Sequence, residues 1–275
     1  MTNYCYLNGK VIPVSQAKIN VTDMGLLRAY AVFDFMCVYN GRVFLAEEHL
    51  DRFEKSAQLL NLKIPLSRKK ILFVIEMLLK KSLKKEANIR IVLTGGETFG
   101  AKHDTKKRTF FILVEDGFRL PPALYKKGAA VVTLEYERTF PTAKTTNYAA
   151  ALLDADRRKK EGAVETLYVS GDKVLEATTS NFFIFKGDTL ITPKNNVLIG
   201  ITRNTILHLA KAAFKVEERD IFRSELADAD EAFLTATNKE VLPIVKIDTR
   251  PVGTGLPGKK TLWIMNAFRD YTKRF

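Results

Sequence analysis

The chain has 275 residues, of which 46% are hydrophobic, 27% charged and 10% aromatic, and this usage excludes a disordered, collagen-like or coiled-coil protein. Lysine and arginine total 44 against 31 acidic residues, which gives a formal net charge of +13. A basic chain suggests nucleic acid as a partner. Most of the excess, however, lies in short lysine clusters at the ends and outer faces of predicted helices. We therefore expect a solvated basic surface and no nucleic-acid binding.

Several other classes are also disfavoured. No apolar run reaches the roughly 18 residues that a membrane span needs, and the first residues lack the basic and apolar segments of a signal peptide. Cys5 and Cys37 are too few for a disulfide framework, and neither they nor the three histidines have the spacing of a metal site. The sequence thus predicts a cytoplasmic protein with no membrane partner and no bound metal.

Short strands joined by tight turns open the chain. Asn8-Gly9 and Asn40-Gly41 each stand between β-prone runs, a strong hairpin signal because both residue types tolerate a positive φ. Apolar residues at helical spacing then predict helices over about 46–61 and 67–83. The predicted strands of this half are residues 4–7, 11–13, 31–39, 43–45, 89–93 and 109–114.

Residues 118–123 are the best candidate for an interdomain linker, because Pro121 and Pro122 interrupt strand pairing. They would separate a small N-terminal α/β domain, 1–117, from a larger C-terminal, cofactor-binding domain, 124–275. The predicted helices of the second half are 147–160, 202–214 and 260–272, and its predicted strands are 129–134, 166–169, 182–185, 189–191, 231–236 and 242–247. Helices and strands are interleaved but many neighbouring strands are hairpins, so the predicted class is α+β with mixed sheets.

Three segments of the second half carry residues suited to chemistry. Lys144 lies among small residues just before a predicted helix; it could hold an aldehyde as a Schiff base, although most lysines are surface residues. Glu176 lies between hydroxyl-bearing residues and an apolar strand, where it is either a buried carboxylate with a partner or an exposed turn acid. Gly200-Ile201-Thr202 opens a helix whose N–H groups would bind an anion, unless Thr202 is only a cap.

Together these segments form a specific pattern. The order Lys-x-x-Asn-Tyr at 144–148, Glu-Ala-x-x-Ser-Asn-Phe-Phe at 176–183 and Gly-Ile-Thr-Arg at 200–203 resembles the fold type IV pyridoxal-phosphate enzymes, or class-IV aminotransferase family. That family includes branched-chain aminotransferases, D-amino-acid aminotransferases and 4-amino-4-deoxychorismate lyases. The resemblance extends over nearly the whole chain through His49-Leu50-Asp51-Arg52-Phe53, Leu234-Thr235-Ala236-Thr237 and Gly255-Leu256-Pro257-Gly258. It implies a two-domain fold with mixed sheets, a β-barrel-like large domain and flanking helices.

The resemblance also implies a pyridoxal 5′-phosphate cofactor and assigns residues to it. Lys144 would form the Schiff base and then move the proton between substrate and cofactor. Glu176 would pair with the pyridine nitrogen so that the ring can accept electrons. Arg52 would bind the phosphate, because a guanidinium fork suits a dianion. The other implied cofactor contacts are the N–H groups of Ile201 and Thr202, the Thr237 hydroxyl, and Tyr148 near the phenolic oxygen of the ring.

The residues that would hold the substrate carboxylate depart from the common family pattern. Ala29-Tyr30-Ala31 stands where many relatives have Gly-Asp-Gly, and Phe33-Asp34 where they have an aromatic residue and Glu. The loop 94–103 lacks the Arg-x-His with which well-known D-amino-acid aminotransferases hold the carboxylate, although its His103 could contact substrate. Another cation must therefore take that role.

Two arginines are candidates. Arg28 lies in an apolar stretch, and Arg90 lies inside a predicted strand, where alternation places it on one face; if buried it needs an anion, and otherwise it faces solvent. These positions resemble a less common group of bacterial D-amino-acid aminotransferases, in which such arginines replace the loop motif. Arg28 would reach across a homodimer interface, because family sites lie between two domains and near the partner subunit.

The resulting hypothesis is a transaminase that moves an amino group between an amino acid, with D-amino acids favoured, and a 2-oxo acid. A branched-chain L-amino-acid aminotransferase is the first alternative, because Thr235-Ala236-Thr237 and Glu240-Val241-Leu242-Pro243 are common there too. A 4-amino-4-deoxychorismate lyase would use the same lysine and direct the carbanion toward loss of pyruvate. The alternative from a different class is a non-catalytic basic binding protein, which the presence of the cofactor residues disfavours.

Overall fold

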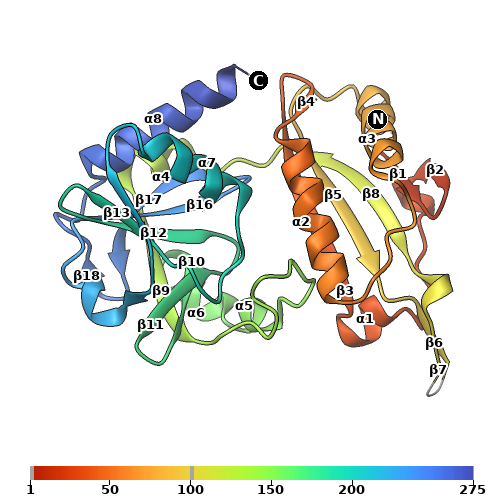
Figure 1. Ribbon diagram of the computed structural model, residues 1–275, viewed down its shortest axis with the longest axis horizontal. Helices are drawn as coiled ribbons and strands as arrows, with labels where there is room; N and C mark the ends of the chain where they lie inside the picture. The colour runs from red at the N-terminus through yellow and green to blue at the C-terminus, as the bar shows by residue number, and fades with distance from the viewer. Residues whose placement is uncertain (1–2, 100–101, 275) are drawn as a thin grey trace. The chain divides into compact units, whose positions relative to one another are not determined.

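The computed structural model describes residues 3–99 and 102–274 (Figure 1). The chain divides into two compact units. The N-terminal unit contains Met1–Phe118 and the short segment Ala143–Asn147, and the C-terminal unit contains Arg119–Thr142 and Tyr148–Arg274. Lys144, which the sequence assigned to the C-terminal domain, is therefore part of the N-terminal unit.

The N-terminal unit is built on an antiparallel sheet with the strand order β2-β1-β8-β5-β3-β4. Its strands are β1 (Tyr4–Leu7), β2 (Lys10–Pro13), β3 (Ala31–Tyr39), β4 (Arg42–Val43), β5 (Ala87–Thr94) and β8 (Phe110–Asp116). The helices are α1 (Met24–Arg28), α2 (Ala46–Leu59) and α3 (Arg68–Ser82). A small hairpin, β6 (Glu97–Phe99) and β7 (Lys102–Asp104), and the 3₁₀ turns Val14–Gln16 and Thr105–Lys107 complete the unit.

Strand alternation decides what each face of this sheet carries. Met36 and Val38 of β3 join the apolar core formed with α2 and α3, and Asp34 shares their face by the same alternation. Phe33 and Phe35 lie on the other face, where Phe35 is in register with Arg90 of β5. The sheet thus separates the residues that contact α2 from an aromatic face that carries Arg90.

The C-terminal unit is built on a large mixed sheet, in which β9 runs parallel to both β10 and β17, and β13 parallel to β14. The strand order along the described chain is β14-β13-β12-β16-β17-β9-β10-β11-β15, with β18 beside β17. The strands are β9 (Ala129–Glu135), β10 (Ala163–Ser170), β11 (Lys173–Ala177), β12 (Asn181–Lys186), β13 (Thr189–Thr192), β14 (Lys215–Glu218), β15 (Ile221–Phe222), β16 (Glu231–Ala236), β17 (Glu240–Ile247) and β18 (Arg250–Pro251).

Helices pack around this sheet. They are α4 (Pro122–Lys127), α5 (Ala149–Leu153), α6 (Ala155–Lys160), α7 (Ile201–Ala210) and α8 (Lys259–Lys273), with a 3₁₀ turn at Arg223–Leu226. Aromatic side chains fill the core between strands β12 and β16, where the rings of Phe183 and Phe233 stack with centroids 4.8 Å apart. Buried aromatic pairs of this kind stabilise the fold by more than the apolar area that they remove from water would give.

Most predicted elements are confirmed, and the differences have local causes. The predicted helix 147–160 is two short helices, because the Asp154 side chain at their junction bonds Arg157 and Thr166 instead of facing solvent. The predicted strand 43–45 ends at Val43, since Leu45 adopts a left-handed conformation as the N-cap of α2. Residues 118–123 include the first turn of α4, where Pro122 suits the helix start.

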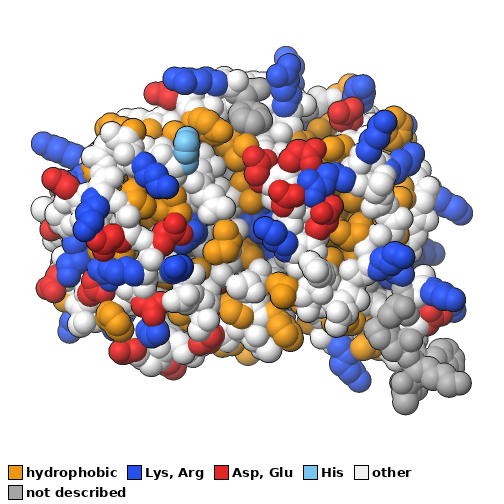
Figure 2. All heavy atoms as spheres, viewed as in Figure 1, with side chains coloured by type: hydrophobic (Ala, Val, Ile, Leu, Met, Phe, Trp, Pro, Cys, Tyr) orange, Lys and Arg blue, Asp and Glu red, His pale blue; other side chains and the backbone are white. Residues whose placement is uncertain are grey.

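Two features of the structure relate to the classes that the sequence disfavours, a nucleic-acid-binding protein and a membrane protein. On the face shown in Figure 2, Lys and Arg side chains are interspersed with acidic ones. None of the helices in the described ranges is long and apolar enough to cross a membrane.

Two glycines allow the cost of backbone strain to be separated from the cost of a steric clash. Both Gly171 (φ +59°) and Gly253 (φ +52°) adopt the left-handed region, but a Cβ at Gly253 would lie 2.0 Å from the Asp230 carbonyl oxygen, whereas Gly171 has nothing within 4 Å. Gly171→Ala should lower the free energy of unfolding by about 1–2 kcal/mol. Gly253→Ala should lower it by a further ~1–3 kcal/mol, because backbone must move. Urea unfolding of both variants measures the difference, and equal losses would contradict the predicted clash.

Candidate active site

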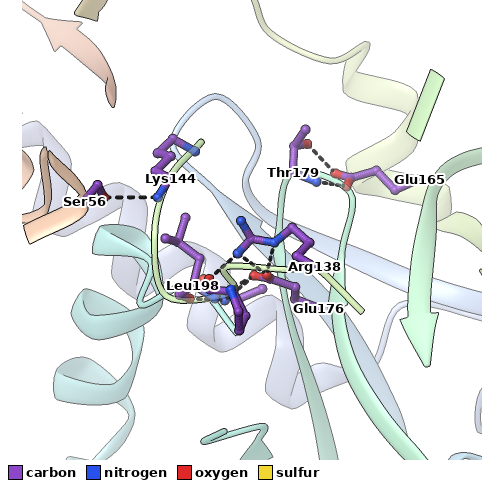
Figure 3. A network of polar contacts seen from close by, with 9 residues as sticks. Ser56, Arg138, Lys144, Glu165, Glu176, Thr179 and Leu198 are labelled. Atoms are coloured by element: carbon purple, nitrogen blue, oxygen red, sulfur yellow. Dashed lines mark hydrogen bonds and ion pairs between the residues drawn. The ribbon is translucent and has the colours of Figure 1, made fainter. Parts of the chain in front are cut away.

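Lys144 is fixed in the N-terminal unit by backbone pairing. The segment 143–147 lies along the edge of β3, where Phe33 N donates to Lys144 O at 2.9 Å and Thr146 N donates to Ala31 O at 3.2 Å. Lys144 N donates to Oγ of Ser56, a fully buried residue of α2, at 3.0 Å (Figure 3). The Lys144 ammonium lies 4.6 Å from the centroid of the Phe33 ring. The backbone of this lysine is thus held by both a strand and a helix.

Arg52, on α2, is one member of a buried cluster of charged and polar groups. Its Nε and Nη2 donate to Asp34 at 2.8 and 2.9 Å, and His49 Nδ1 contacts the same carboxylate at 2.7 Å. Asp34 and His49 are almost fully buried, and Arg52 is 9% exposed. Burial alone would raise the pKa of Asp34, but Arg52 and His49 hold that pKa well below its usual value. Burial lowers the pKa of His49 and outweighs the opposite effect of Asp34.

The two candidate carboxylate-binding arginines differ in setting. Arg90 is half-buried, with its guanidinium carbon 5.7 Å from the Phe33 centroid and 5.0 Å from that of Phe35. Glu115 on β8 accepts from its Nε at 2.5 Å and from its Nη2 at 3.1 Å. Arg28 is exposed at the end of α1 and donates to the Leu27 carbonyl. The structure therefore brings Arg90 and Lys144 to one aromatic ring and leaves Arg28 at the surface.

Glu176, at the end of β11, is the centre of a polar network in the C-terminal unit (Figure 3). Its Oε1 accepts from Nε and Nη2 of Arg138 at 2.9 and 2.6 Å, and its Oε2 accepts from Leu198 N at 3.0 Å. Asn181 Nδ2 donates to Leu198 O at 2.7 Å and lies 3.4 Å from Glu176 Oε2. Glu176 is 6% exposed, so it is a buried, partnered carboxylate rather than a turn acid.

The first turn of α7 has the features of an anion site. Gly200 is the N-cap, no side chain caps the helix, and Ile201 and Thr202 are buried at its first two positions. The N–H groups there have no intrahelical acceptor and attract negative charge. A Cβ at Gly200 would lie 2.1 Å from Asn181 Oδ1, so only glycine allows the helix start to approach this side chain.

The remaining predicted residues lie at turns. Tyr148 is the half-buried N-cap of α5, and Thr237 lies in the turn that joins β16 to β17. Near them in sequence, Thr146 Oγ1 and Thr235 Oγ1 are buried without a hydrogen-bond partner in the described chain. Buried hydroxyls without partners are uncommon, and within the C-terminal unit the Thr235 hydroxyl and the uncapped α7 fit a phosphate-bearing cofactor with polar substituents.

Sequence reasoning missed Arg138, Ser56 and Asp34 as parts of the site. Arg138 lies in the loop before Lys144 and also donates to the Pro141 carbonyl, but nothing in its neighbourhood in the sequence distinguishes it from other arginines. Ser56 could have been found from helical spacing, since it stands one turn after Arg52 on the same face of α2. Within the described residues no group of three or more His, Cys, Asp or Glu side chains could hold a metal ion.

Comparisons with known proteins show the family of the chain. Residues 31–247 match the Amino-transferase class IV family. A Methanocaldococcus jannaschii protein named "Putative branched-chain-amino-acid aminotransferase" is 33% identical over 96% of this chain and 95% of its own length. A Listeria innocua D-alanine aminotransferase is 27% identical over 95% of this chain and 93% of its own. A solved T.th. branched-chain amino acid aminotransferase with pyridoxamine 5′-phosphate has a TM-score of 0.89 at 25% identity, covering 99% of this chain and 94% of that one.

The chain therefore belongs to the class IV aminotransferases. The predicted enzyme class is confirmed, and so is the predicted fold, a mixed α and β structure of fold type IV. Class IV aminotransferases use pyridoxal 5′-phosphate, which confirms the expected cofactor.

The Arg138–Glu176 ion pair gives a prediction about stability. The two side chains are 18% and 8% exposed, so Arg138→Leu would leave a buried carboxylate without its cation. The free energy of unfolding should fall by about 3 kcal/mol. Arg223→Leu is the matched control, because its pair with Glu135 is 48% and 62% exposed and should contribute less than about 1 kcal/mol. Similar losses in both variants, measured by denaturant unfolding, would argue against Glu176 as a buried charge.

Proposed function

We propose that this protein transfers the amino group of a D-amino acid to a 2-oxo acid through pyridoxal 5′-phosphate. The observation that carries the proposal is the Phe33 ring, which has the Lys144 ammonium 4.6 Å and the Arg90 guanidinium 5.7 Å from its centroid. An amino acid that reacts beside Lys144 needs a cation for its carboxylate, and Arg90 supplies one at that ring. A guanidinium between aromatic faces can still bind a carboxylate in the plane of its fork.

The other residues would have the roles that the resemblance implies. Lys144 Nζ would bind the cofactor aldehyde, and its amine would move the proton at the substrate α-carbon. Glu176, held in orientation by Arg138, would pair with the pyridine nitrogen of the cofactor, which would supply an electron sink. Arg52, the N–H groups of Ile201 and Thr202, and the Thr237 hydroxyl would hold the cofactor phosphate, and Tyr148 would contact the phenolic oxygen of the ring.

A branched-chain L-amino-acid aminotransferase is the second candidate. The named relatives divide between branched-chain and D-alanine aminotransferases, so similarity alone supports both substrate classes. Arg90 supports the D-amino-acid proposal through the resemblance of its position to the D-amino-acid aminotransferases that lack the loop motif; its charge alone would suit the carboxylate of either enantiomer.

We further infer that the active form is a homodimer in the cytoplasm. Leu26 and Leu27 on α1 are 68% and 42% exposed beside Arg28, which gives an apolar surface with one cation at its end. Covering this surface with a second copy would bring Arg28 to the partner's substrate. The two cysteines, Cys5 and Cys37, are free and buried, as expected for a reducing compartment.

The role of Lys144 is tested by its removal. Lys144→Ala should lose the near-visible absorbance of bound cofactor, the trapping of cofactor by borohydride, and turnover. The change removes the amine that binds the aldehyde but leaves the backbone bonds to Ser56 and Phe33 possible. Spectroscopy and mass spectrometry of the reduced protein make the measurement. Cofactor that remains covalently trapped in this variant would assign the role to another lysine.

The role of Arg90 is tested with two kinds of amino donor. Arg90→Leu should raise the KM for D-alanine about 10- to 150-fold, the range for a lost charge-assisted bond, and lower kcat through poorer orientation. A primary amine without a carboxylate should be affected little. The comparison separates carboxylate recognition from general damage, since equal losses on both donors would make Arg90 structural. A wild-type preference for L-leucine over D-alanine in the first half-reaction would instead support the branched-chain alternative.

A further inference from the structure

A second buried ion pair in the C-terminal unit has no role in the function proposed so far. Lys239 Nζ lies 2.6 Å from Glu165 Oε1, and the two side chains are 9% and 3% exposed. Glu165 comes from β10, whereas Lys239 comes from the turn before β17. Strand β9 lies between β10 and β17 in the sheet, and the two side chains meet at Thr179, which donates its backbone N–H to Glu165 and accepts from the Lys239 ammonium.

On its own side, Glu165 organises the segment that follows Glu176. Its carboxylate accepts from Thr178 Oγ1 at 2.7 Å, from Thr179 N at 2.8 Å, and from the Ser180 hydroxyl (the Thr179 bond is drawn in Figure 3). Burial would raise the pKa of Glu165, but Lys239 and these donors hold that pKa below its usual value. The residues between Glu176 and strand β12 are therefore tied to one ionised side chain.

On the other side, Lys239 anchors the turn that carries Thr237. Its ammonium also donates to Thr179 Oγ1 at 2.6 Å, its backbone N donates to Ala236 O, and its carbonyl accepts from the Tyr125 hydroxyl at 2.9 Å. The next residue, Glu240, has a φ of +57°, a conformation that a non-glycine residue keeps only when the surrounding bonds impose it. The turn is held at both its backbone and its side chain.

Stability alone does not account for such a pair. Desolvating two charges costs about as much as their attraction returns, and apolar replacements are often neutral or stabilising. A buried pair that fixes one arrangement of two loops is the better-supported use of such charges. Here the two loops are Thr178–Ser180, next to the proposed partner of the pyridine nitrogen, and Thr237–Lys239, which carries a proposed phosphate ligand.

We propose that Lys239 is a positioning residue: by bonding Glu165 and Thr179 it fixes the Thr237–Lys239 turn so that the Thr237 hydroxyl meets the cofactor phosphate. This inference rests on the function proposed above. It assigns Lys239 no contact with cofactor or substrate. Its effect is therefore confined to the part of cofactor affinity that depends on the phosphate.

The test compares pyridoxal 5′-phosphate with pyridoxal, which lacks the phosphate. The bound cofactor is first removed from the protein. The dissociation constants of pyridoxal 5′-phosphate and of pyridoxal are then measured by absorbance and by competition. Thr237→Val should reduce the preference for the phosphorylated form about 10-fold, as for one lost bond to a charged group. Lys239→Met should reduce it by a similar factor, with pyridoxal affinity unchanged. In the double variant the two losses should not multiply, because both act through one hydroxyl.

Two further variants separate positioning from stability. Lys239→Met alone leaves Glu165 buried without its cation, whereas Lys239→Met with Glu165→Gln removes both charges and should recover much of the lost stability. The preference for phosphate should stay reduced in this double variant, because the anchor of the turn is still missing. Lys173→Met is the matched control, since its pair with Asp220 is 46% and 24% exposed. It should leave the preference unchanged.

The outcomes distinguish this inference from the function on which it rests. A wild-type protein that binds both forms equally would overturn the proposed phosphate site and this inference together. If Lys239→Met prefers pyridoxal 5′-phosphate over pyridoxal as strongly as the wild type does, this inference alone would be overturned. Two other results would also overturn this inference alone. One is a double variant, Lys239→Met with Thr237→Val, whose loss of phosphate preference is the product of the two single losses. The other is a phosphate preference that returns together with stability when Glu165→Gln is added to Lys239→Met.

Discussion

Buried charges require partners, and this constraint shapes the site in both units. Near Lys144 the carboxylate of Asp34 is enclosed by Arg52 and His49, and in the C-terminal unit Glu176 accepts from Arg138 and from the backbone N–H of Leu198. Burial disfavours the charged form of each carboxylate and its partners stabilise that form; for Asp34 they hold the pKa well below its usual value. The same partners also fix the directions of the carboxylate side chains, so the contacts that offset the charge also hold each side chain in place.

The partners also limit what each charge can do. Nε and Nη2 of Arg52 are committed to Asp34, and only Nη1 lacks a hydrogen bond to another described residue. Arg52 therefore has one N–H-bearing nitrogen and little net charge left for a phosphate dianion. If the phosphate binds as proposed, we expect the uncapped first turn of α7, with its N–H groups and its positive dipole end, to contribute more to that binding than the arginine.

Periodicity and turn chemistry predicted most elements of the fold, because each helix or strand buries a face that its own sequence displays. The sequence left Glu176 either buried with a partner or exposed in a turn, and it did not indicate Arg138 as that partner, since their contact joins a loop to a strand 38 residues away. Lys239 gave no signal at all. Its burial depends on Glu165, a residue far earlier in the sequence that meets it only in the folded chain, where both bond Thr179. Local sequence patterns therefore do not predict contacts between residues that are far apart in the sequence.

Phe33 shows how an apolar residue can serve a charged site. Alternation places its ring on the face of β3 away from α2, where Lys144 and Arg90 both lie within cation–π distance. The ring attracts each cation without neutralising it, whereas a carboxylate at this position would bind both tightly and compete with substrate. Glu115 offsets the charge of Arg90 from the neighbouring strand, on the side of its Nε. In the proposed function, a substrate carboxylate would share this guanidinium with Glu115, so recognition would depend on geometry at the fork rather than on net charge alone.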